Sequence, residues 1–76
     1  MHPDAIDCLL RGLQKDSSSP RELAVNGLKT MDLDKLNNPE FWAEKIINAL
    51  QSAKEVETED FLIEKYNKAI QIFSAY

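Results

Sequence analysis

Residues 38–54 read NPEFWAEKIINALQSAK, and this stretch decides the fold class. Its bulky apolar side chains and alanines recur every three or four residues, at Trp42, Ile46, Ala49, Leu50 and Ala53. At about 100° per residue, these positions form one apolar stripe along a helix. Asn38 before Pro39 is typical of a helix start, because proline at the first helical position gives up no hydrogen bond. The stretch therefore predicts an amphipathic helix over residues 39–54.

A second stripe follows after a short acidic segment. The spacing repeats at Leu62, Tyr66, Ala69, Ile70 and Phe73. Thr58 comes just before Glu59 and Asp60, and this order suits a helix start because acidic side chains stabilise the positive end of the helix dipole. A helix is therefore predicted over residues 59–75, packed on the first as a helical hairpin.

The proline signal also appears twice in the first half of the chain. His2-Pro3 marks one helix start, and Ser19-Pro20 marks another. Glu22 completes a capping box with Ser19, since the two side chains can reach each other's backbone N–H groups. These signals predict helices over residues 3–15 and 20–30.

Two smaller features complete the helical pattern. Leu33 and Leu36 lie in the connection between the second and third helices, and they predict a short helical turn that packs both leucines on the core. Gly12 and Gly27 fall inside helices, where glycine costs about 1 kcal/mol relative to alanine. We therefore expect these glycines where two helices approach closely.

These patterns predict an all-α fold, a small compact bundle of four short helices with mostly antiparallel neighbours, because the connections are short. No alternation typical of a strand pair occurs. One helical domain is expected over residues 1–76, since a chain of this length supports one modest core. That core is predicted to hold Ile6, Leu9, Leu10, Leu13, Leu23, Leu28, Met31, Leu36, Trp42, Ile46, Leu50, Leu62, Tyr66, Ile70 and Phe73.

One segment resembles a known repeat family. Residues 64–73 read EKYNKAIQIF and look like the second helix of a tetratricopeptide repeat, and Trp42 is similar to the aromatic residue that opens such repeats. Lys45 and Ile46 stand where that repeat has leucine and glycine, and the spacing from Trp42 to Ala69 is about four residues too long. No binding residues are transferred to this chain from that family.

The charge balance limits the classes of partner. The 76-residue chain has 13 acidic against 9 basic side chains, which gives a net charge of −4 and a pI near 4.8. Long-range electrostatics therefore repel phosphate backbones and anionic membranes, and we expect neither nucleic acid nor a membrane as partner. No stretch approaches the roughly 20 apolar residues of a membrane span, and the N-terminal residues lack the pattern of a signal peptide. The expected compartment is the cytoplasm.

Residues suited to catalysis or metal binding are scarce. His2 is the single histidine, and Cys8, the single cysteine, is expected to pack at the edge of an apolar stripe rather than to act as a thiolate. Asp32-Leu33-Asp34 resembles the opening of a calcium loop, but Asn37 and Ala43 stand where such a loop needs glycine and glutamate. One of the two aspartates is instead expected to cap the short turn. The sequence thus predicts no enzyme, no cofactor and no metal site.

Several large apolar residues lie outside the stripes, and those singled out as candidate anchors are Phe41, Phe61, Ile72 and Tyr76. Either the first two helices bury Phe41 and Phe61, or the two phenylalanines form an exposed apolar patch that marks an interface with a partner. The densest acidic run consists of Glu55, Glu57, Glu59 and Asp60. It is either a solvated turn that suits the following helix dipole or a rim that steers a basic partner.

By elimination, the sequence predicts a small intracellular protein-protein interaction module that acts as an adaptor, regulator or inhibitor. The expected anchors are the four apolar residues, with the acidic run as the rim, and the expected partner is another protein of basic character. One alternative is an antidote-type protein, similar to a bacteriocin-immunity protein or an antitoxin. Another is a structural subunit that associates with itself, the simplest form being a homodimer.

Overall fold

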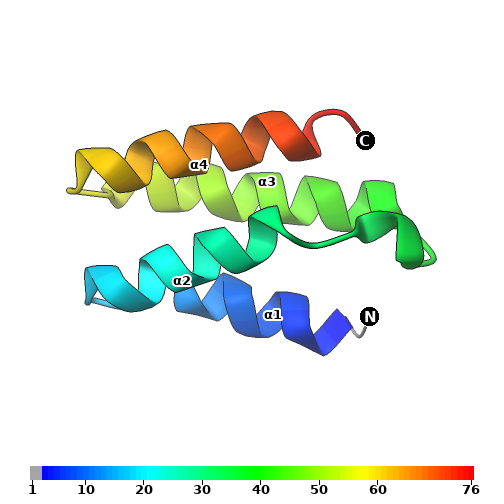
Figure 1. Cartoon of the computed structure of the whole chain (residues 1–76), viewed down its shortest axis with the longest axis horizontal. Coiled ribbons are helices and arrows are strands. Elements are labelled where there is room, and N and C mark those ends of the chain that lie inside the picture. The colour runs from blue at the N-terminus through cyan, green and yellow to red at the C-terminus, as the bar shows by residue number, and fades with distance from the viewer. Residues whose placement is uncertain (1–2) are drawn as a thin grey trace.

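The computed structural model describes residues 3–76 and confirms an all-α bundle (Figure 1). Its elements are α1 (Pro3–Gly12), α2 (Ser18–Lys29), the short 3-10 helix η1 (Leu33–Lys35), α3 (Pro39–Val56) and α4 (Asp60–Phe73). None of the helices in the described chain combines the length and the apolar character that crossing a bilayer demands.

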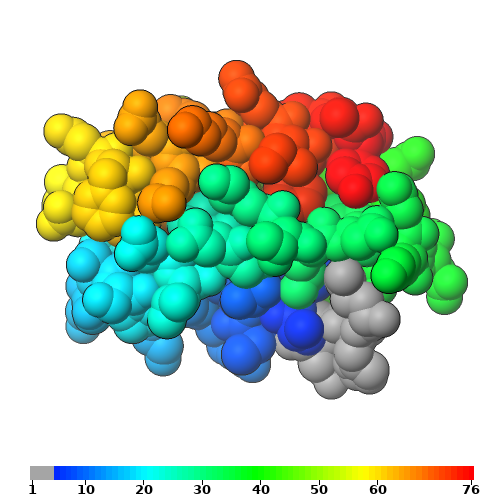
Figure 2. Space-filling view, in the orientation of Figure 1, coloured from blue at the N-terminus to red at the C-terminus, as the bar shows by residue number. Residues whose placement is uncertain are grey.

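The helices form two antiparallel hairpins, α1 with α2 and α3 with α4 (Figure 1). The hairpins meet through α2 and α4, which run in the same direction, and η1 packs on α3. Figure 2 shows α2 between α4 and α1 on one face of the molecule. The helices therefore follow one another around the bundle as α1, α2, α4 and α3. Both hairpin turns lie at one end, called here the hairpin end, and the α2–α3 connection lies at the other.

The proline signals place two of the helix starts correctly. α3 begins at Pro39 after Asn38, and α1 begins at Pro3, with His2 outside the described residues. α2 begins at Ser18 instead of residue 20, so the predicted capping box is wrong. Proline is tolerated anywhere in the first turn, where backbone N–H groups have no intrahelical partner, so it does not fix the first residue.

The remaining helix boundaries differ from the predicted ones by one to three residues. α1 ends at Gly12 instead of residue 15, and α4 spans Asp60–Phe73 instead of 59–75. α3 runs two residues further than predicted, to Val56. The short turn around Leu33 is confirmed as η1, and the side chain of Asp32 caps it by accepting a hydrogen bond from the N–H of Asp34 at 3.2 Å.

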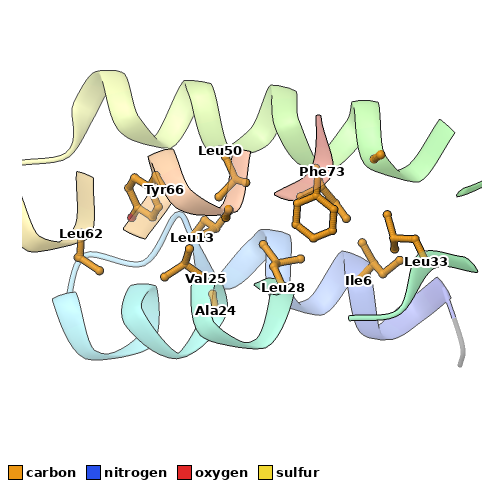
Figure 3. Packing of buried hydrophobic residues seen from close by; sticks show 13 residues of the cluster. Ile6, Leu13, Ala24, Val25, Leu28, Leu33, Leu50, Leu62, Tyr66 and Phe73 are labelled. Carbon is orange, nitrogen blue, oxygen red and sulfur yellow. The ribbon is translucent and has the colours of Figure 1, made fainter. Parts of the chain in front are cut away.

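One apolar core runs along the bundle (Figure 3). Eight of its predicted members are buried: Ile6, Leu13, Leu28, Ile46, Leu50, Leu62, Tyr66 and Phe73. Six more are half-buried against it: Leu9, Leu10, Met31, Leu36, Trp42 and Ile70. Leu33, which was expected to pack on the core, and Ala69 of the predicted stripe are buried as well. Ala24, Val25 and Ala43 are also buried, although they were not among the predicted core residues.

The prediction for Leu23 is wrong, since its side chain is 71% exposed. α2 turns Ala24, Val25 and Leu28 inward, and at about 100° per residue this directs Leu23 to solvent. The expected role of Gly27 is confirmed at the contact with α1, where a Cβ at this position would lie 2.9 Å from Leu9 Cδ2.

Candidate interaction surface

A polar cluster made by Arg21, Glu57 and Tyr66 closes the hairpin end of the bundle. The Arg21 guanidinium donates to both carboxylate oxygens of Glu57, with Nε–Oε1 at 2.8 Å and Nη2–Oε2 at 2.9 Å. Its Nη1 also donates to the backbone carbonyls of Lys15 and Asp16, at 2.9 and 2.7 Å. Arg21 therefore joins the α1–α2 turn to the end of α3.

Glu57 completes this cluster from the α3–α4 turn. Its carboxylate accepts hydrogen bonds from the Tyr66 hydroxyl at 2.7 Å and from the backbone N–H groups of Thr58 and Glu59 at 3.0 and 3.1 Å. Burial raises the pKa of Glu57, but the hydrogen bonds from Arg21 and Tyr66 outweigh it and hold the pKa below its ordinary value. Burial and the bond to the carboxylate raise the pKa of Tyr66.

Glu57 consequently does not belong to the exposed acidic rim. Its side chain is 1% exposed, because the hydrogen bonds to Arg21 and Tyr66 draw it into the bundle. Glu55, Glu59 and Asp60 remain exposed around the same turn. The carboxylate of Glu57 is already fully engaged by the chain itself, so this cluster stabilises the fold and offers no group for chemistry on a substrate.

The four predicted anchors are all exposed, so burial under the first two helices does not occur. Phe41 is 58% exposed, Phe61 and Ile72 are each 43% exposed, and Tyr76 is 39% exposed. Leu23 and Val56, which were not among the predicted anchors, are exposed as well.

The anchors divide between the two ends of the bundle. Phe41 and Phe61 each lie in the first turn of a helix, and because α3 and α4 are antiparallel these turns lie at opposite ends (Figure 1). Phe61 lies at the hairpin end near the acidic run. Phe41 lies at the other end with Ile72 and Tyr76, where α3 begins and α4 ends. The structure thus separates one predicted anchor from the other three.

Two carboxylates accompany the three anchors that share an end. Glu40 and Glu44 of α3 line a pocket of about 320 Å³ together with Tyr76. Figure 2 shows the C-terminal residues lying against the segment around the start of α3. Phe41 and Ile72 do not line this pocket, although they lie at the same end of the bundle. We call Glu40, Phe41, Glu44, Ile72 and Tyr76 together the anchor surface. Neither glutamate was predicted as a site residue, although their spacing of four residues on one helix places them on the same face.

A second concave region lies where α1 and α3 face each other. This groove of about 490 Å³ is lined by apolar side chains of both helices, with polar side chains at its margins: Leu10, Leu13, Gln14, Lys45, Asn48, Ala49, Ser52, Ala53 and Val56. An ion pair between Lys45 Nζ and Asp7 Oδ1, 3.1 Å apart, joins α1 to α3. Helix periodicity alone did not predict this groove, because it depends on which helices pack together.

The residues that the sequence offers for catalysis or metal binding do not come together as a reactive centre in the described part of the chain. Cys8 is exposed, contrary to the expectation that it packs. α1 turns Ile6 and Leu13 into the core, and Cys8 lies on the opposite side of the helix. Within the described residues, no group of three or more His, Cys, Asp or Glu side chains is placed to hold a metal ion. His2 lies outside those residues.

Comparison with known proteins finds no matching family model, no matching curated protein and no matching solved structure.

Proposed function

We propose that this chain is a small cytoplasmic protein-protein interaction module, acting as an adaptor, regulator or inhibitor without catalytic activity. It binds a basic protein partner through the anchor surface. One observation carries the proposal: three exposed apolar anchors and two exposed carboxylates share one end of the bundle. Single exposed apolar residues are ordinary, whereas aromatic residues are enriched at the centre of interfaces and polar residues at their rim.

The aromatic anchors are held in place before any partner binds. The Phe41 ring packs edge-on against Trp42, with ring centroids 5.3 Å apart and planes at 84°. The Tyr76 ring stacks on Phe73, with centroids 6.4 Å apart and planes at 28°. These ring contacts restrict the rotamers of Phe41 and Tyr76, which reduces the conformational entropy that the two side chains lose on binding. Ordered aromatic side chains are also the most frequent energetic centres of interfaces.

The charges of the surface favour a basic partner. Within the described side chains, the ion pairs join Arg21 to Glu57, Lys45 to Asp7 and Lys65 to Glu22. The two glutamates of the anchor surface take part in none of these pairs, so they are available to cations of a partner. The net charge of −4 adds a long-range attraction that increases the association rate of a basic protein at low salt.

Two more specific functions are related to this proposal, one as a special case of it and one as an alternative. An antidote-type protein would be the case in which the basic partner is a toxin. A structural subunit would use the same apolar anchors on a second copy of the chain. The acidic character of the anchor surface favours the basic partner over the second copy, since two such surfaces would bring like charges together.

The test is affinity capture from an extract of the source cells, with two variants of equal severity. The double variant Phe41→Ser/Tyr76→Ser removes two anchors, and Leu23→Ser/Val56→Ser removes two exposed apolar side chains elsewhere. We expect the wild type and the second variant to retain the same basic protein in stoichiometric amount, and the first variant to lose it. High salt should weaken the retained complex.

Two outcomes would contradict the proposal. If the wild type retains no stoichiometric protein at low salt, the chain is not an interaction module of this kind. If both variants lose the partner equally, the anchor surface is not the binding site. Both variants should still unfold cooperatively, with a small decrease in melting temperature for Phe41→Ser/Tyr76→Ser because it removes the ring contacts with Trp42 and Phe73.

A further inference from the structure

We infer that α1 is a lid, which opens as a unit while α2, α3 and α4 stay packed together. The anchor surface plays no part in this opening, because its residues belong to α3, α4 and the C-terminus. In a folded protein, elements with few buried contacts open at a lower free energy than the whole chain. α1 is such an element in its packing, in its share of the core and in its polar contacts.

α1 packs closely against a single neighbour. In the described chain, the closely packed pairs of α-helices are α1 with α2, α2 with α4 and α3 with α4. Between α1 and α3 lies the groove of about 490 Å³ instead. Detachment of α1 therefore breaks its interface with α2, whereas both interfaces that hold α2, α3 and α4 together remain.

α1 also contributes little to the core. Among its described side chains, Ile6 alone is fully buried, while Leu9 and Leu10 are half-buried. Each of the other three α-helices buries at least three side chains. Because burial of apolar surface is the main favourable contribution to folding, α1 gains less from packing than its neighbours do. A helix of 10 residues also has little stability of its own.

The polar cluster at the hairpin end holds the other three α-helices together without α1. Arg21 of α2, Glu57 after α3 and Tyr66 of α4 are joined by hydrogen bonds of 2.7 to 2.9 Å. Arg21 also donates to the carbonyls of Lys15 and Asp16, which follow α1 in the chain. The cluster therefore fixes the turn next to α1, so the hinge of the lid lies between the end of α1 and this turn.

Within the described side chains, one ion pair ties α1 to α3, and it is weak. Asp7 Oδ1 and Lys45 Nζ lie 3.1 Å apart, but both side chains are more than two-fifths exposed. Exposed ion pairs contribute little to stability, because water screens both charges. Lys45 Nζ also lies 5.0 Å from the centre of the Trp42 ring, so it keeps a partner on α3 when Asp7 moves away.

Opening of α1 uncovers an apolar surface on the other helices. α1 packs on α2 at Ala24 and Gly27, where small residues let the two helices approach closely. On its other side α1 borders the groove, in which Ala49 and Ala53 of α3 lie. When α1 moves away, these two regions join into one surface that α1 largely covers in the closed chain. The lid thus controls which surface the protein presents.

Amide hydrogen exchange of the wild-type chain tests the lid, followed by NMR at several urea concentrations below the unfolding transition. We expect the amides of Cys8, Leu9 and Leu10 to be protected about tenfold or more weakly than those of Tyr66 and Ala69. The three α1 amides should share one opening free energy that depends little on urea, since opening of α1 exposes less surface than global unfolding does.

Two outcomes of this experiment would overturn the lid. Equal protection in α1 and α4 would mean that α1 opens only when the whole chain unfolds. Protection that rises steadily along α1 from its first residue would mean that the helix frays residue by residue instead of opening as a unit.

The variant Glu57→Gln separates opening of α1 from unfolding of the whole chain. The polar cluster is intact whether α1 is closed or open, so weakening it should leave the protection of the Leu9 amide within about twofold of the wild type. The protection of the Leu28 and Tyr66 amides should decrease about tenfold, because a charged hydrogen-bond network is lost from the folded state. An equal decrease at Leu9 and Tyr66 would contradict the inference.

Thiol labelling gives an independent measurement. Ile6→Cys/Cys8→Ser and Leu62→Cys/Cys8→Ser each place one thiol at a fully buried position, and Cys8 is replaced because it is exposed. Urea added to the more stable variant matches their free energies of global unfolding. A thiol reagent should then label the Ile6→Cys variant about tenfold or more faster than the Leu62→Cys variant. Equal labelling rates would show that α1 does not open on its own.

Discussion

Glu57 holds the hairpin end of the bundle together, because its one carboxylate accepts five hydrogen bonds. Since the pKa of Glu57 in the folded chain lies below its ordinary value of 4.5, its contribution to stability is complete above that value. The contribution is lost as the pH falls through the lowered pKa. We therefore expect the free energy of unfolding to decrease on acidification below about pH 5.

Urea unfolding at a series of pH values checks this prediction. Glu57→Gln should lower the free energy of unfolding at neutral pH and make its decrease with acidification shallower than in the wild type. Glu59→Gln is the matched control, because its exposed side chain should leave the wild-type pH dependence unchanged. An identical pH dependence in Glu57→Gln and wild type would show that the cluster does not depend on the ionised carboxylate.

Individual residues also show where sequence patterns lose their predictive power. In the sequence, Glu57 is one of several acids in a turn, and nothing separates it from Glu55 or Glu59. Its burial depends on Arg21, which is 36 positions away in the chain. Such a pairing follows from tertiary packing, so local charge patterns could not predict it. The sequence also left open whether Phe41 and Phe61 are buried, because a position outside the stripes does not show whether another helix covers it.

At the scale of the elements, the contact between α1 and α2 depends on small residues. A Cβ at Gly12 would lie 2.9 Å from the Cβ of Ala24, which is attached to the backbone and cannot rotate away. Gly12→Ala should therefore push the two helices apart and destabilise the fold by about 1 to 3 kcal/mol. At Gly27 the nearest atom is the end of the flexible Leu9 side chain, so Gly27→Ala should cost less.

Thermal or chemical unfolding of both variants tests this difference, and the double variant Gly12→Ala/Ala24→Gly provides the control. Exchanging the methyl group across the contact should restore part of the lost stability, although glycine inside α2 costs about 1 kcal/mol. Equal destabilisation by the two single variants would mean that the helices adjust without moving apart.

The helices themselves were largely predictable, because each long stripe and each proline carries local information. Asn38-Pro39 gave the start of α3 correctly. α2 was the weakest case: Leu23, Ala24, Val25 and Leu28 occupy more than half of its circumference, so periodicity alone did not show which side is buried. Packing of α2 against both α1 and α4 decided in favour of Ala24, Val25 and Leu28.

At the scale of the whole molecule, short turns explain the two hairpins but not how the hairpins meet. The contact between α2 and α4 depends on the longer connection between α2 and α3, where Leu33 is buried. This contact leaves α1 and α3 facing each other across the groove. Because α3 and α4 are antiparallel, the exposed apolar residues of the described chain are divided between the two ends of the bundle. They do not form a single surface.

That division leads to a prediction about the oligomeric state. A stable homodimer buries about 800 Å² of surface on each partner. Apolar residues that are divided between two ends of the bundle are poorly placed to form one interface of that size. Light scattering at rising concentration should therefore give a constant mass of 8.7 kDa. A mass that rises toward twice this value would favour the self-associating subunit, and its reversal by Phe41→Ser/Tyr76→Ser would assign the anchor surface to the dimer.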